Sequence, residues 1–137
     1  MDFPVLILAG YSGAGKTTIA REFSRRFGYG FIEHQKLVHD IAKSRGFARA
    51  RHWLHETGIN NFVNDSLLEM HSRINLLKET GIKGVITDVA YGENMIRSFK
   101  GWFPQSQVIV ASVLVDKKIR ESRVGGRMGG VERGCLY

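Results

Sequence analysis

The feature that most constrains the fold is a glycine-rich segment between an apolar run and a helix-forming run. It reads Gly10-x4-Gly15-Lys16-Thr17 and matches the complete P-loop pattern. Glycines let the backbone turn its N–H groups toward an oxyanion, and the helix that follows adds the positive end of its dipole. Lys16 supplies a cation for the β and γ phosphates, and the Thr17 hydroxyl can ligate Mg2+. The residues predicted to bind nucleotide are Gly10, Ser12, Gly13, Ala14, Gly15, Lys16, Thr17 and Thr18.

The chain around this segment alternates between strand and helix patterns. Val5–Ala9 is continuously apolar, which predicts a strand buried on both faces. Alternation of strands with helices predicts a single α/β domain over residues 1–137, with a parallel sheet. Further strands are expected at Gly30–Glu33, Val85–Asp88 and Gln107–Val115, and helices at Thr17–Phe27, Lys36–Ser44, Arg49–Thr57, Asn60–Thr80, Asn94–Lys100 and Lys117–Val124.

Two of these helices have an apolar stripe at helical spacing, which predicts one face packed on a core. In the first helix the stripe is Ile19, Ala20, Phe23 and Phe27. In the longest helix it is Phe62, Val63, Leu67, Met70, Ile74 and Leu77.

Composition and charge limit the class of protein. The 137 residues fit one domain, and the apolar (43%) and charged (24%) shares are ordinary for a globular chain. The longest apolar run is far short of the roughly 20 residues of a membrane span, so we expect no membrane association. The single Cys135 excludes an internal disulfide and favours the cytoplasm. The net charge of +7 calls for an anionic partner, but the basic residues are spread rather than gathered in one stripe.

Asp88 is the predicted second half of the metal site. A P-loop site needs a carboxylate at the end of a buried strand to hold Mg2+ directly or through water. Gly84-Val85-Ile86-Thr87-Asp88 has that form. A strand that ends in Asp is also an ordinary turn entry. Beside the P-loop, the metal role is favoured, and Thr17 and Asp88 are the predicted metal ligands.

Several P-loop classes are excluded by missing motifs. A GTPase would carry Asp-x-x-Gly here, but Asp88 is followed by Val89-Ala90-Tyr91. The chain has no Asn-Lys-x-Asp motif to read a base and no Leu-Ser-Gly-Gly segment of a transporter ATPase. The domain is also small for a motor or an unfoldase. What remains is the small-molecule kinase group.

From Val5 to about Arg127 the chain resembles the P-loop nucleoside-monophosphate-kinase-like family, including dephospho-CoA kinases and adenylate or cytidylate kinases. The resemblance implies a P-loop NTPase fold with three α/β/α layers and about four strands in the order 2-3-1-4. It implies ATP and Mg2+ as cofactors. It also implies a helical acceptor-binding region over about residues 34–80 and a lid over about residues 120–130.

The resemblance also suggests which residues contact the acceptor and the transferring phosphoryl group. Phe31-Ile32-Glu33-His34 matches the family's short strand that ends at the acceptor. The predicted acceptor residues are Glu33, His34 and Arg45. Glu33 and His34 could instead be ordinary polar residues at the end of an element, and Arg45 could merely be solvated. Arg120, Arg123 and Arg127 look like the lid arginines, which stabilise the charge that develops on the phosphoryl oxygens. A solvated basic face is the alternative. The predicted catalytic residues are Lys16, Asp88, Arg123 and Arg127.

Three functions remain open at this stage. The leading one is an ATP- and Mg-dependent phosphotransferase acting on a small acceptor such as dephospho-CoA, a nucleoside monophosphate, a nucleoside or a shikimate-like alcohol. The others are a nucleotide-binding module with little catalysis and a nucleic-acid-dependent ATPase, which ranks last because no nucleic-acid motif is present. After about Arg127 only Met128–Tyr137 remain, so we expect a shortened family member with an exposed sheet edge that a homodimer could cover.

Overall fold

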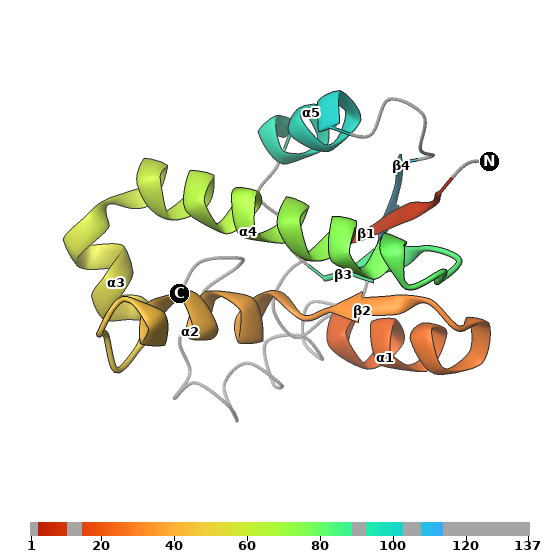
Figure 1. Cartoon of the computed structure of the whole chain (residues 1–137), viewed down its shortest axis with the longest axis horizontal. Helices are drawn as coiled ribbons and strands as arrows, with labels where there is room; N and C mark the ends of the chain where they lie inside the picture. Colours follow the sequence, from red (N-terminus) through yellow and green to blue (C-terminus); the bar gives the residue numbers. More distant parts are fainter. Residues whose placement is uncertain (1–2, 11–14, 89–92, 103–107, 114–137) are drawn as a thin grey trace.

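The computed structural model describes residues 3–10, 15–88, 93–102 and 108–113. Within these ranges strands and helices alternate along the chain as the sequence predicts (Figure 1). The predicted helix at 117–124 and the predicted lid at 120–130 lie outside the described residues. The elements are β1 (Val5–Ala9), α1 (Lys16–Phe27), β2 (Gly30–Ile32), α2 (His34–Ser44), α3 (Ala50–Thr57), α4 (Ile59–Glu79), β3 (Val85–Thr87), α5 (Glu93–Trp102) and β4 (Val108–Ser112).

The four strands form one parallel sheet in the order β2-β3-β1-β4, which confirms the predicted order. β1 lies inside the sheet because its continuous apolar sequence suits burial on both faces. Its register pairs Ile7 with Thr87 of β3 and with Val110 of β4. Since all strands run the same way, the segments that follow β1, β2 and β3 meet at one edge of the sheet.

Two apolar clusters show that helices cover both faces of the sheet. On one face Val5 and Ile7 of β1 pack in the main core with residues of α2, α3, α4 and α5. On the other face Leu8 of β1 packs with Ala20 of α1 and Ile86 of β3. The alternation of side chains along β1 therefore produces the three predicted layers.

The apolar stripe of α4 is confirmed, and that of α1 is only partly buried. Four of the six α4 positions are buried, and Val63 and Leu77 pack against the same core. In α1, Ala20 is fully buried and Phe23 is partly buried, but Ile19 and Phe27 are 43% and 55% exposed. Phe27 covers the Phe23 ring, with their centroids 4.7 Å apart, at the margin of the helix face that meets the sheet.

Several element ends differ from the expectation. α2 begins at His34, two residues before the predicted start, and the Asp88 side chain accepts the His34 N–H. β2 and β3 end one residue early, which leaves Glu33 and Asp88 outside the sheet. β4 ends at Ser112, and Val113 continues only through its N–H bond to the carbonyl of Ala9 (2.8 Å).

Candidate active site

The described ends of the P-loop have backbone angles that favour glycine. Gly10 has φ 150° and Gly15 has φ 91°, both in the region that L side chains rarely adopt. Gly15 is the N-cap of α1 in a left-handed conformation, and Lys16 is the first helical residue. The first turn of α1 has no acidic side chain, so its N-terminus keeps the positive dipole end that favours an anion. Ser12, Gly13 and Ala14, predicted to contact nucleotide, lie outside the described residues.

Lys16, Thr17 and Asp88 converge at the shared edge of the sheet. The Lys16 Nζ donates to the Gly10 carbonyl oxygen at 2.6 Å, across the loop to which both belong. The Thr17 hydroxyl donates to Asp88 Oδ2 at 2.7 Å, which joins α1 to the end of β3. Thr18 is next along α1, with an exposed side chain. The predicted cation, hydroxyl and carboxylate are therefore neighbours in space although Asp88 is 71 residues from Thr17 in the sequence.

These groups have the chemistry that a magnesium–triphosphate complex needs. Hydroxyl and carboxylate oxygens are the hard ligands that Mg2+ prefers, and it commonly uses one or two protein ligands together with phosphate oxygens and water. Within the described part of the chain no three His, Cys, Asp or Glu side chains gather as a metal cage. Thr17 and Asp88 thus fit a site completed by phosphate and water, with Lys16 placed for the phosphates.

His34 lies against the same carboxylate. Its main-chain N–H donates to Asp88 Oδ1 at 2.9 Å, so β3, α1 and α2 meet at one side chain. The imidazole is only 4% exposed. Burial, and then the nearby charge of Lys16, lowers the pKa of His34 to about 3. The imidazole is therefore neutral at physiological pH and adds no positive charge beside Lys16.

Glu33 borders an open hollow beside β2. Its carboxylate accepts from Arg21 Nη2 at 3.2 Å, with the glutamate side chain 25% exposed. The hollow has a volume of about 520 Å³ and an apolar floor from β2 and the end of α4. Charged side chains form its rim, and Arg73 there pairs with Asp40 at 3.3 Å. The lining residues are Phe31, Ile32, Glu33, Lys36, Asp40, Arg73, Leu76 and Leu77.

The structure does not bring Arg45 to this corner. Arg45 is the C-cap of α2, and α2 rises about 1.5 Å per residue, so Arg45 lies roughly 16 Å from His34 along the helix. Its guanidinium pairs with Asp65 at 2.6 Å and lies 5.1 Å from the centre of the Trp53 ring. Its acceptor role stays a prediction. Arg123 and Arg127 lie outside the described residues, so their lid role also stays a prediction.

Three residues at or beside the hollow have contacts that the sequence did not predict. Arg21 was not identified as the partner of Glu33, and Asp40 and Arg73 were not connected with a site. Asp40 and Arg73 are 33 residues apart on different helices, so no local pattern links them. The spacing of Glu33, at the N-cap of α2, and of Lys36 and Asp40 within α2 is a sequence signal that could have indicated a shared polar face.

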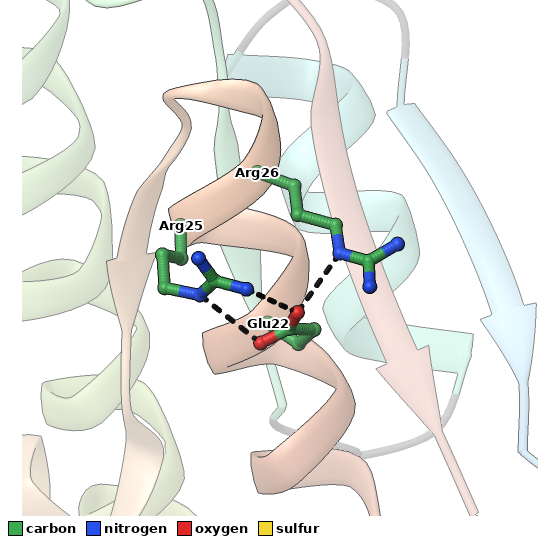
Figure 2. Close-up of polar contacts among 3 residues, drawn as sticks. All are labelled: Glu22, Arg25 and Arg26. Carbon is green, nitrogen blue, oxygen red and sulfur yellow. Dashed lines mark hydrogen bonds and ion pairs between the residues drawn. The ribbon is translucent and has the colours of Figure 1, made fainter.

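Two arginines of α1, Arg25 and Arg26, form ion pairs with one carboxylate of the same helix. Glu22 accepts hydrogen bonds from Arg25 (2.6 Å) and Arg26 (2.8 Å), as Figure 2 shows. The hydrogen bond from Arg25, and then that from Arg26, lowers the pKa of the Glu22 carboxyl. Both arginines are in the last turn, where the negative end of the helix dipole stabilises cations.

Of the helices described, none combines the length and apolar character that a membrane crossing requires.

The sequence matches no protein-family model and no curated protein. Solved structures resemble the fold closely at low sequence identity. A gluconokinase from Sinorhizobium meliloti 1021 superposes with a TM-score of 0.61 and 18% identity, over 94% of this chain and 68% of that one. A shikimate kinase from Bacteroides thetaiotaomicron gives 0.64 and 18%, over 94% and 66%. A sugar kinase from Janibacter sp. HTCC2649 gives 0.64 and 19%, over 94% and 69%.

The chain therefore spans about two thirds of the length of these solved chains. The likeness covers nearly all of this chain. The chain has the α/β fold of these solved structures, with its four strands in the order β2-β3-β1-β4.

Proposed function

We propose that the protein is an ATP- and Mg-dependent phosphotransferase that acts on a small hydroxyl- or phosphate-bearing acceptor. The observation that carries the proposal is the convergence of Lys16, Thr17 and Asp88 at the carboxyl edge of the sheet. Ligands of open α/β sheets bind at that edge. The kinase activity of the structural neighbours gives the proposal further support.

The donor side uses groups of the loop and of β3. Lys16, whose Nζ contacts the Gly10 carbonyl oxygen at 2.6 Å, would bind the β and γ phosphates. Thr17 and Asp88, which share a hydrogen bond of 2.7 Å, would hold Mg2+ directly or through its waters. Bound Mg-ATP would supply the phosphoryl group, and the cation would neutralise part of its charge. The neutral His34 beside Lys16 adds no competing positive charge.

The acceptor side is proposed at the junction of β2 and α2. Glu33 directly precedes His34, whose N–H donates to Asp88, so Glu33 lies next to the proposed metal ligands. Its carboxylate could orient or deprotonate the attacking hydroxyl once that group is within hydrogen-bond reach. The hollow that Glu33 borders, about 520 Å³, is in the size range of small-molecule sites, roughly 300–1,000 Å³. We propose that part of the acceptor occupies this hollow.

A small acceptor is favoured over nucleic acid by the way the positive charge is compensated. Arg25 and Arg26 pair with Glu22, Arg45 with Asp65, and Arg73 with Asp40 and Glu69. A nucleic-acid surface presents its cations to phosphates as a patch or stripe. In the described ranges these arginines instead meet carboxylates of the same chain. We further propose that Arg123 and Arg127 act on the transferring phosphoryl group.

A coupled ADP-release screen tests the proposal. Wild-type protein with Mg-ATP is offered sugars, shikimate-like alcohols, nucleosides, nucleoside monophosphates and dephospho-CoA. We expect one class to release ADP above the acceptor-free rate. Lys16→Ala should lower that rate on the order of 100- to 1,000-fold, because it removes a charge aimed at the transferring group. Lys43→Ala, on the exposed side of α2, is the matched control and should keep the wild-type rate.

The alternatives give different results when DNA and RNA are added to the panel and ATP binding is measured beside ADP release. ATP binding with no ADP release from any acceptor would contradict phosphotransfer and favour the binding-module hypothesis. ADP release stimulated only by DNA or RNA, and weakened steeply by salt, would favour the nucleic-acid-dependent ATPase.

A further inference from the structure

α2 begins without a cap of its own. Glu33 is the N-cap residue, with φ −78° and ψ 117°, and its side chain makes no capping hydrogen bond. The first turn contains no acidic residue. The first amides of a helix have no partner within the helix, so they need an acceptor from elsewhere.

Asp88 supplies that acceptor from the end of β3. Its Oδ1 accepts the His34 N–H at 2.9 Å, from 54 residues away in the sequence. A carboxylate at this position also lies favourably at the positive end of the α2 dipole. Its other oxygen, Oδ2, accepts the Thr17 hydroxyl at 2.7 Å. One carboxylate therefore ties the starts of α1 and α2 together.

The preceding residues reinforce the same junction. Ile32, at the end of β2, pairs with Thr87, at the end of β3. The buried Thr87 hydroxyl donates to the Ile32 carbonyl oxygen at 2.9 Å. The contact of Asp88 with His34 therefore lies just beyond the last residue pair of β2 and β3, and it joins the two segments through a side chain.

We propose that Asp88 is a positioning residue for the acceptor side, in addition to its metal role. It fixes the start of α2, and with it Glu33, relative to Thr17 on the P-loop helix. The catalytic meaning of this role rests on the proposed function, but the contact itself does not require it. Loss of the Asp88 oxygen should loosen the start of α2 in protein that holds neither nucleotide nor cation.

Amide hydrogen exchange measured by NMR on the nucleotide-free, EDTA-treated protein tests this role. Asp88→Ala removes the acceptor, so exchange at His34, Gln35 and Lys36 should accelerate by about tenfold, the usual effect of losing a helix cap. In Asp88→Asn the amide oxygen can still accept from His34, and its NH2 can donate to Thr17. We therefore expect exchange within about twofold of wild type in this variant. This rescue by asparagine separates the cap from the charge that a metal ligand needs.

Asp65→Asn is the matched control, because Asp65 contacts Arg45 at the opposite end of α2. It should leave exchange at residues 34–36 unchanged. Unchanged exchange in Asp88→Ala would overturn the proposal, and so would equal acceleration in Asp88→Asn. The measurement uses no substrate, so a failed ADP-release screen would leave its result standing.

A second pair of variants tests the contact from the donor side, should Asp88→Ala not fold. His34→Pro removes the donated N–H at the first helical position, where proline fits. His34→Gln removes the same imidazole but keeps the N–H. Exchange at Gln35 and Lys36 should be about tenfold faster in His34→Pro than in His34→Gln. Equal exchange in the two would contradict the proposal.

Discussion

At the scale of single residues, His34 links burial to charge at the candidate site. Its folded-state pKa of about 3 is below the ordinary histidine value of 6.5, because burial and then the charge of Lys16 disfavour the imidazolium. As the pH falls, the unfolded chain therefore binds this proton before the folded chain does. The stability that comes from a neutral His34 is fully present above about pH 6.5 and is lost as the pH falls toward 3.

Because the pKa of His34 is lowered in the folded state, the free energy of unfolding should fall as the pH falls below about 6.5. Between pH 7 and pH 5 the wild type should lose about 2 kcal/mol more unfolding free energy than His34→Gln, which has no group to protonate there. Urea unfolding at the two pH values measures the difference. His39→Gln, an exposed histidine on the same helix, should keep the wild-type pH dependence. Equal losses in the wild type and His34→Gln would show that His34 is not held neutral.

The relative positions of the candidate-site residues were predictable from the sequence where a motif defined them. The P-loop pattern predicted Lys16 and Thr17, and a strand ending in Asp predicted Asp88 as their neighbour. The burial of His34 was not predictable, because it arises from elements that pack around residue 34 from distant parts of the chain.

At the scale of elements, Gly84 shows how closely the chain just before β3 approaches Pro4 and Tyr29. A Cβ at Gly84 would lie 2.7 Å from the Pro4 carbonyl oxygen and 2.7 Å from the Tyr29 ring. The Pro4 oxygen already accepts the Val85 N–H at 3.0 Å, so it has little freedom to move. By contrast, a Cβ at Gly101 in α5 meets nothing within 4 Å.

Replacement by alanine should therefore have opposite effects on the free energy of unfolding at Gly84 and at Gly101. Gly84→Ala should destabilise the fold by about 1–3 kcal/mol, since the added methyl meets backbone. Gly101→Ala should stabilise it by up to about 1 kcal/mol, because alanine favours a helix and has open space there. Denaturant unfolding of both variants measures the effects. A Gly84→Ala protein as stable as wild type would contradict the close packing of this turn.

Elements with strong periodicity were predicted to within a residue or two. The buried stripe of α4 and the apolar run of β1 define them locally. The start of α2 was placed two residues late, since the carboxylate that accepts its first N–H belongs to Asp88, 54 residues away in the sequence. The hollow beside β2 was not predicted at all, because α4 contributes residues that only the tertiary fold brings there.

At the scale of the whole molecule, the sheet brings the candidate donor and acceptor sides together. The parallel order β2-β3-β1-β4 places the ends of β1, β2 and β3 at one edge. Lys16, Glu33 and Asp88 each follow one of these strands. Because this edge forms only on folding, a ligand bound there stabilises the folded state, by about 2.7 kcal/mol at a concentration of 100 times Kd.

We expect this edge of the sheet to bind a nucleoside triphosphate through Lys16. Calorimetric titration of the wild type with ATP in the presence of Mg2+ measures it most directly. We expect saturable one-to-one binding that weakens on the order of a hundredfold in Lys16→Met, through the loss of a charged hydrogen-bond donor. Lys43→Met should bind as the wild type does. No heat of binding in the wild type, or equal affinity in Lys16→Met, would contradict the claim.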